Sequence, residues 1–326
     1  MITTIDALRD RVEQLYDYGI NKGYSTGWAE IDEHYTVKLG CTTYLVGHEF
    51  SGKSEWMLEL LMNLSLKHGL RHAIFSPETG NAEEITSVLC EKYIGQQFYG
   101  EYKMSVSDMY KALDFINEHF FIIDPKTDDI TIKNLYLKVD KFCKEIDKEI
   151  HTTLIDPFNE LKIDYEGMPR DIWLEQALGF VRKNARNTGR HHFIVTHPRD
   201  SDRLYHSKDG YNLPPTRKDY AGGQAWARKG ESMLTLWRPP YYEVNERNEY
   251  TDQKTGRPYE KNEAHLIIQK AKPRGIGKLG KVVLFYDWKR SHYFYRDQME
   301  RKVYADCHKK IVEEKPNLDF SNGVPF

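Results

Sequence analysis

The sequence has few cysteines and no long hydrophobic run. In its 326 residues no apolar stretch reaches the length that crosses a membrane, which excludes a membrane-spanning protein. Residues 1–15 lack the apolar core of a signal peptide. The cysteines form no C-x-x-C pair, which argues against zinc and against a disulfide framework. They are Cys41, Cys90, Cys143 and Cys307. We therefore expect reduced thiols, a cytoplasmic protein and no membrane partner.

The sequence also has little net charge, and it contains no repeat or low-complexity tract. Its formal net charge is −2, which does not indicate a nucleic-acid-binding protein by itself. The charge is uneven, because residues 182–238 contain twelve Lys and Arg against five Asp and Glu, a surplus of seven positive charges. Such a segment is either a solvated face or a surface for a phosphate backbone. Composition leaves both interpretations open.

Short apolar runs alternate with helical patterns through most of the chain. Strands are expected at about 42–46, 71–76, 120–124, 152–156 and 191–196, with helices after the first and from about residues 82, 131 and 171. This alternation predicts an α/β fold with a mostly parallel sheet and helices on both faces. After Ser232, strands follow one another without long helices, which predicts an antiparallel extension at one edge of the sheet.

Three segments are expected along the chain. Residues 1–22 contain a linker helix at 4–18, whose apolar side chains form one narrow stripe. Several glycines follow this helix and separate it from the next segment. Its stripe packs either on its own domain or on a neighbouring subunit, and the sequence does not decide between them. Residues 23–303 form the α/β domain, and residues 304–326 form a flexible C-terminal tail.

The most specific motif is GHEFSGKS, which fits the phosphate-loop pattern G-x-x-x-x-G-K-[ST]. It consists of Gly47, His48, Glu49, Phe50, Ser51, Gly52, Lys53 and Ser54. A loop bounded by glycines can wrap its backbone N–H groups around a polyphosphate at the start of the following helix. Lys53 would contact the β- and γ-phosphates, and the Ser54 hydroxyl would bind Mg²⁺. An ordinary strand-to-helix turn is the alternative, but the strand before the loop and the helix after it favour the phosphate loop.

Three polar residues follow other predicted strands of the same sheet. Asp156 ends the strand at 152–156, where its carboxylate can hold the water shell of the loop-bound Mg²⁺. Glu78 follows the strand at 71–76 and is the candidate base that activates water. His197 follows the strand at 191–196 and is a candidate contact to the γ-phosphate. The alternatives are a strand-end turn, a helix-start glutamate and a surface histidine, respectively.

Two further segments carry basic residues on loops. A loop of about thirty residues after His197 is too long to be a simple connection. We expect it to contact nucleic acid through Arg217, Lys218, Gly222, Gly223, Arg228 and Lys229. Farther on, Lys272 and Arg274 flank a proline in KAKPRGIGKLG, and we expect them to point at an anion. An edge strand protected by lysine is the alternative.

Together these motifs resemble those of the hexameric replicative helicases of the DnaB type, and within them the branch of Twinkle and the phage primase-helicases. The resemblance covers residues from about Gly23 to Tyr295. It rests on the strings GYSTGWAEID, GHEFSGKS, FSPET, NEHFFIIDP, IDPFNEL, VTHPRD, DYAGGQAWARKGESMLTLWR and KAKPRGIGKLG.

The resemblance implies a RecA-like domain that binds ATP at subunit interfaces. It assigns Glu78 as the catalytic carboxylate and His197 as a phosphate sensor, and it directs Lys272 and Arg274 into the site of a neighbouring subunit. The region 217–230 would face a central channel. The sequence shows neither the primase domain of the phage enzymes nor the helical amino-terminal domain of the bacterial ones. We therefore expect a separate primase, with a single-stranded-DNA-binding protein or a polymerase as further partners.

The sequence thus predicts a ring-forming helicase, a hexamer by resemblance, in a bacterial or phage-infected cytoplasm. It would hydrolyse ATP, or another NTP or dNTP, with Mg²⁺, while moving along single-stranded DNA and unwinding duplex. Two alternatives stay open. One is a recombinase-like filament ATPase, and the other is an ATP-gated module that binds or loads on DNA without translocating.

Overall fold

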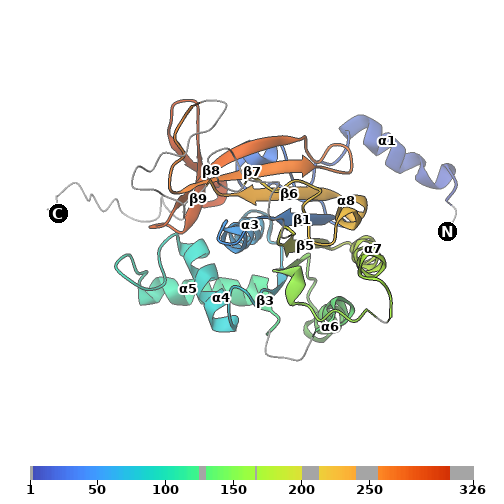
Figure 1. Cartoon of the computed structure of the whole chain (residues 1–326), viewed down its shortest axis with the longest axis horizontal. Helices are drawn as coiled ribbons and strands as arrows, with labels where there is room; N and C mark the ends of the chain where they lie inside the picture. The colour runs from blue at the N-terminus through green and yellow to red at the C-terminus, as the bar shows by residue number, and fades with distance from the viewer. Residues whose placement is uncertain (1–2, 125–129, 166, 200–212, 240–255, 309–326) are drawn as a thin grey trace.

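The computed structural model describes residues 3–124, 130–165, 167–199, 213–239 and 256–308. Within these residues the strands form one sheet in the order β10-β9-β8-β7-β6-β1-β5-β4-β2-β3 (Figure 1). The strands are β1 Thr42–Val46, β2 His72–Phe75, β3 Phe120–Ile122, β4 Thr152–Ile155, β5 His191–Thr196, β6 Ser232–Trp237, β7 Glu263–Lys270, β8 Gly280–Asp287, β9 His292–Arg296 and β10 Lys302–Tyr304.

The sheet has a parallel part and an antiparallel part. Strands β6, β1, β5, β4, β2 and β3 run parallel to one another. Strands β7, β8, β9 and β10 continue from β6 in antiparallel pairs. The predicted parallel sheet with an antiparallel extension at one edge is therefore confirmed.

Helices cover both faces of the sheet. The described helices are α1 Arg9–Tyr18, which stands apart from the sheet, and α2 Ala29–Asp32, α3 Lys53–His68, α4 Ala82–Ile94, α5 Val106–His119, α6 Ile132–Ile146, α7 Arg170–Thr188 and α8 Gln224–Lys229, with short 3-10 turns η1 Asp6–Leu8, η2 Phe158–Glu160 and η3 Asp306–His308. Strand β1 shows why two cores form, because successive side chains of a strand point to opposite faces. Leu45 packs with α3, α4 and α5, whereas Tyr44 and Val46 pack with α6, α7 and α8.

Local capping explains where several helices begin. The side chain of Asn81 accepts a hydrogen bond from the amide of Glu84, and the Glu84 side chain accepts one from the Asn81 amide, which together start α4. The Thr131 side chain caps α6. These starts agree within one residue with the expected ones. Helix α5 was not expected from the sequence, although Ser105 caps it by accepting from the amide of Asp108.

The N-terminal helix buries no side chain against the other described residues. Helix α1 contains no buried residue, and Ile5, Val12 and Leu15 are each at least half exposed. Figure 1 shows α1 standing apart from the sheet and its covering helices. The apolar stripe that the sequence predicts is therefore present but uncovered within the described residues.

The C-terminal end of the domain differs from the expected boundary. Residues 304–308 are packed, because Ala305 is fully buried and the amide of Asp306 donates a hydrogen bond to the carbonyl of Gly27. The flexible tail expected from residue 304 therefore does not begin there. Residues 309–326 lie outside the described residues. Among the described helices, none is both long and apolar enough to cross a membrane.

Candidate functional site: a nucleotide pocket at the strand ends

The phosphate loop lies between β1 and α3, where the sequence predicts it. Gly52 has a left-handed backbone (φ +84°) and no side chain caps the start of α3, so the first amides of this helix remain available to an anion. Gly47 allows the loop to lie close to the backbone of β6, because a Cβ at this position would stand 2.4 Å from the carbonyl oxygen of Leu236. Lys53 Nζ donates to the carbonyl of His48 across the loop, at 2.9 Å. These features form a compact loop, and the available amides at the start of α3 fit phosphate groups.

Asp156 is fully buried beside the start of α3. Its side chain is hydrogen-bonded with Ser54, and Ser76 Oγ donates to its Oδ2 at 3.4 Å. Its Oδ1 has no hydrogen-bond partner among the described residues. Burial raises the pKa of Asp156 to about 6, and the nearby charge of Lys53 opposes that rise. A buried carboxylate with a free oxygen beside a hydroxyl is a donor set that fits Mg²⁺.

Glu78 and His197 meet at the same edge of the sheet. His197 Nε2 lies 3.2 Å from Glu78 Oε2, and both side chains are partly exposed. The strand order explains this meeting, because β1, β5, β4 and β2 are successive neighbours and run parallel. The residues after their carboxyl ends, Lys53, His197, Asp156 and Glu78, therefore line one edge. The structure thus brings together the four predicted residues around one phosphate loop.

Lys272 and Arg274 lie at the opposite end of the strands. They follow β7, which runs antiparallel to β6, and Lys270 at the end of β7 pairs with Met233 near the start of β6. The side chains of Lys272 and Arg274 are exposed. Strand β1 alone separates the two ends of the sheet by about 16 Å. These cations therefore face away from the phosphate loop of their own chain.

A basic cavity of about 470 Å³ lies at this opposite end. It is lined by Gly40, Cys41, Arg182, Arg186, Arg228, Gly230, Glu231, Lys270, Lys272 and Pro273. Glu231 forms ion pairs with Arg182, at 2.9 Å, and with Arg186, at 3.1 Å. The lining thus contains five cationic side chains and a single carboxylate, that of Glu231. Arg182, Arg186 and Lys270 were not predicted as site residues, although the first two lie within the basic segment and are four residues apart on α7.

The predicted nucleic-acid residues differ in their surroundings. Arg217 and Lys218 are exposed. Arg228 and Lys229 form ion pairs with Glu175 of α7, at 3.5 Å and 3.3 Å.

The paired glycines of this segment also differ from each other. Gly222 has φ +98° and a Cβ there would stand 2.3 Å from Leu174 Cδ2, so packing on α7 already requires glycine at this position. Gly223 has φ +80° with no heavy atom within 4 Å of its would-be Cβ. Residues 200–212 of the same loop lie outside the described residues.

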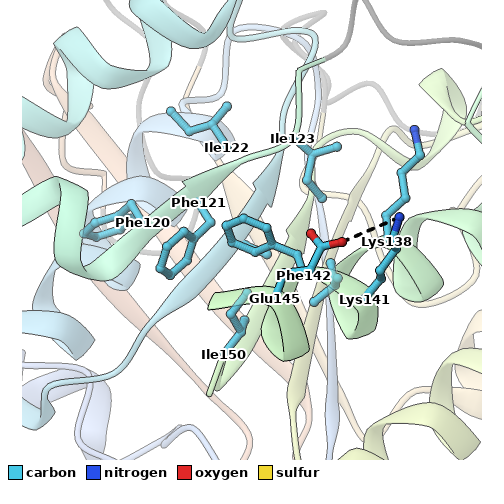
Figure 2. Close-up of a pocket in the computed structure, with 11 residues that line it drawn as sticks. Phe120, Phe121, Ile122, Ile123, Lys138, Lys141, Phe142, Glu145 and Ile150 are labelled. Carbon is cyan, nitrogen blue, oxygen red and sulfur yellow. Dashed lines mark ion pairs between the residues drawn. The ribbon is translucent and has the colours of Figure 1, made fainter. Parts of the chain in front are cut away.

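A separate groove of about 510 Å³ is apolar and carries none of the predicted site residues. Figure 2 shows it between β3 and α6, with Phe121, Ile123 and Phe142 around it. The Lys141–Glu145 ion pair, with 3.5 Å between Nζ and Oε1, lies along its wall. Because β3 is the last strand of the sheet, the groove lies at the outer edge of the domain. The groove therefore has none of the charged groups that converge beside the phosphate loop.

Comparison with known proteins places this geometry in a wider context. No model of a protein family matches the sequence. The chain is 28% identical over 240 residues to the Twinkle homolog protein, chloroplastic/mitochondrial, of Arabidopsis thaliana. That match covers 70% of this chain and 32% of the relative, so the chain spans about a third of the relative's length.

Two solved structures share the fold. The ATPase domain of G40P matches with a TM-score of 0.70 and 18% identity, covering 91% of this chain and 100% of that one. A DnaB-like replicative helicase, from a structure that concerns its interactions with primase, matches with a TM-score of 0.65 and 17% identity. This second match covers 90% of this chain and 67% of that one. The chain therefore has the RecA-like ATPase fold of the DnaB-type helicases.

Proposed function

We propose that the chain is the motor domain of a replicative DNA helicase that hydrolyses ATP, or another NTP or dNTP. The observation that carries this proposal is the convergence of the phosphate loop, Asp156, Glu78 and His197 at one edge of the sheet, with Lys272 and Arg274 at the opposite end. Similarity to the Twinkle homolog and to DnaB-like ATPase domains supports it.

Each residue of the edge has a distinct role in this proposal. The loop amides and Lys53 bind the β- and γ-phosphates, and Ser54 and Asp156 hold Mg²⁺. When bound, Mg²⁺ neutralises charge on the phosphate oxygens. Glu78 accepts a proton from the attacking water, and its 3.2 Å contact with His197 orients both side chains. His197 then contacts the γ-phosphate and responds to its loss.

The position of Lys272 and Arg274 supports assembly of several copies into a ring. Because they face away from the phosphate loop of their own chain, they can complete a nucleotide site only on another copy. A head-to-tail contact that joins one end of the sheet to the other edge generates a closed ring or a helical filament. The DnaB-type fold favours the ring, and we infer a hexamer.

We infer that single-stranded DNA is held by the basic surface that carries Arg217 and Lys218, beside Lys270. The mutual repulsion of these cations supports the inference. Burial lowers the pKa of Lys270 and the positive charges of Lys272, Arg182 and Arg217 lower it further, so an anion there would relieve them. Arg228 and Lys229 would contribute by leaving their ion pairs with Glu175 and binding DNA phosphates instead.

We infer that α1 packs on a neighbouring subunit, since the described part of its own chain leaves its apolar stripe uncovered. A separate primase is a further proposed partner, because one structural relative is described with its primase interactions. A single-stranded-DNA-binding protein or a polymerase would act beside it. The proposed setting is the cytoplasm of a bacterium or of a phage-infected host.

The test of this function combines hydrolysis with native mass. The purified chain should hydrolyse ATP faster when single-stranded DNA is added, assemble as a hexamer with nucleotide, and displace a strand from a forked duplex. Stimulated hydrolysis without strand displacement would contradict the helicase. In that case open filaments would indicate a recombinase-like ATPase, and closed rings would indicate a loading module.

A further inference from the structure

Three buried side chains outside the nucleotide pocket converge from distant parts of the chain. Glu59 lies in α3, His292 is the first residue of β9, and His308 is the last residue of η3. Their exposed fractions are 0%, 4% and 3%. One carboxylate oxygen and one ring nitrogen from each histidine lie within 4.8 Å of one another. Side chains of these types are rarely buried together without a ligand or a proton between them.

The polar atoms of this cluster are not fully satisfied. His292 Nδ1 lies 3.5 Å from Glu59 Oε1, which is too long for a hydrogen bond. Within the described residues, neither His292 Nδ1 nor His308 Nδ1 has a hydrogen-bond partner. The two imidazole rings stack with 4.1 Å between their centroids. A buried ring nitrogen without a hydrogen-bond partner costs free energy of folding. A ligand bound between the two rings would give both Nδ1 atoms a partner.

Among the described residues, Glu59 forms no ion pair with a lysine or an arginine, although the charge of Lys92 acts on it. Lys92 is fully buried nearby, but its Nζ lies 2.5 Å from Glu55 and donates to the carbonyl of Ser291 at 2.6 Å.

We propose that Glu59, His292 and His308 bind a structural Zn²⁺ ion. Two imidazole nitrogens and one carboxylate oxygen are ligands that Zn²⁺ takes in proteins, with a water as the fourth. Bonds of about 2.0–2.2 Å in a tetrahedron place ligand atoms ~3.4 Å apart. The His292–Glu59 pair already has this spacing. His308, whose Nε2 lies 2.7 Å from Asn63 Oδ1, would join them by turning its ring out of the stack with His292. The ion would also supply the positive charge that Glu59 lacks.

Such an ion would join the phosphate-loop helix to the C-terminal part of the domain. Helix α3 packs against both β9 and η3, so the three ligands come from elements already in contact. Tyr293, next to His292, donates from its hydroxyl to the carbonyl of Gly52 at 3.4 Å. Its amide donates to both oxygens of Glu59, at 2.9 Å and 3.1 Å. The zinc site would thus fix the phosphate loop from behind.

This site gives no local signal in the sequence. Its ligands are at positions 59, 292 and 308, and C-x-x-C pairs, whose absence argued against zinc, are not needed for it. A metal bound by these three groups would act mainly on stability, because it ties together segments that are far apart in the unfolded chain.

The test measures metal content and thermal stability of the full chain, prepared without a histidine tag and without nucleotide. The protein is equilibrated with Zn²⁺, dialysed against metal-free buffer and measured by inductively coupled plasma mass spectrometry. We expect about one Zn²⁺ per wild-type chain and nearly none in Glu59→Gln or His308→Gln. Adding EDTA should lower the melting temperature of the wild type by several degrees and leave that of His308→Gln unchanged.

Two controls separate this site from others. His72 is equally buried in the same core, but its two nitrogens contact Thr152 and Ser65, so His72→Gln should keep its zinc. Asp156→Asn should also keep it, which excludes zinc bound at the nucleotide pocket. Wild-type chain without zinc after equilibration, or His308→Gln with undiminished zinc, would overturn the proposal. If both variants fail to fold, the zinc content of the wild type and of the two controls still decides.

Discussion

Replacing Gly52 by alanine tests whether the phosphate loop is held in its shape by the protein behind it. Gly52 has φ +84°, and an added Cβ would stand 2.4 Å from the hydroxyl oxygen of Tyr293. Tyr293 is 3% exposed, so its ring has no open space into which it can move. Gly69, at the other end of α3, has φ +67° and nothing within 4 Å of its would-be Cβ. Gly69→Ala is therefore a matched control for the backbone alone.

The two substitutions should differ by the cost of the clash. A left-handed backbone costs a non-glycine residue about 1–2 kcal/mol, which applies to both. Overpacking a filled interior costs about 1–3 kcal/mol more, which applies only to Gly52→Ala. Tyr293→Phe removes the clashing oxygen at a cost of about 1 kcal/mol for its hydrogen bond. In the double variant, the clash should disappear while the backbone cost remains, so the two effects should not add.

The assay is urea unfolding followed by circular dichroism, with nucleotide left out, and binding of a fluorescent ATP analogue. Gly52→Ala should lower the free energy of unfolding by more than Gly69→Ala and should weaken nucleotide binding, which Gly69→Ala should not. Tyr293→Phe should recover the excess in the double variant. Equal losses in the two alanine variants, or strict additivity with Tyr293→Phe, would refute the reasoning.

Three further predictions concern the nucleotide site and the N-terminal helix. Lys53→Ala should abolish nucleotide binding, whereas Glu78→Gln should bind normally and hydrolyse at least about 100-fold more slowly; near-normal turnover in Glu78→Gln would remove Glu78 as the base. Asp156→Asn should raise the free energy of unfolding of the nucleotide-free chain at about pH 7 by on the order of 3 kcal/mol, because burial raises the pKa of Asp156 to about 6 and penalises the ionised form above it. Urea unfolding should show that gain vanish as the pH falls from about 6 to 4, and a gain independent of pH would contradict the assignment. Deleting residues 1–18 should reduce the native mass of the oligomer without lowering the melting temperature, since α1 has no buried residue; an intact oligomer with a lower melting temperature would show that α1 packs on its own chain.

The arrangement of the candidate nucleotide site could be predicted from the sequence because its determinants are local. The spacing from Gly47 to Ser54 fixes a loop before a helix, and Asp156 and His197 directly end or follow apolar runs. Parallel strands then bring their carboxyl ends to one edge without further information. The order of the strands was not predicted, yet it decides that Glu78 contacts His197.

Other features depend on contacts between distant segments, which periodicity does not report. The cluster of Glu59, His292 and His308 forms only after β9 and η3 pack on α3. The basic cavity joins α7 to the turn after β7. Gly222 illustrates a different limit, since its sequence context indicated phosphate binding while its packing against Leu174 already requires glycine.

The central claim is that each nucleotide site is completed by a neighbouring copy, and subunit mixing tests it most directly. Arg274→Ala and Glu78→Gln should each hydrolyse ATP very slowly, since such arginines contribute on the order of 10³ or more in rate. Mixed rings contain interfaces with an intact Glu78 facing an intact Arg274, so the mixture should recover partial hydrolysis. If native mass confirms that the subunits have exchanged and the mixture is no more active than its two components, the account of a site shared between neighbours is contradicted.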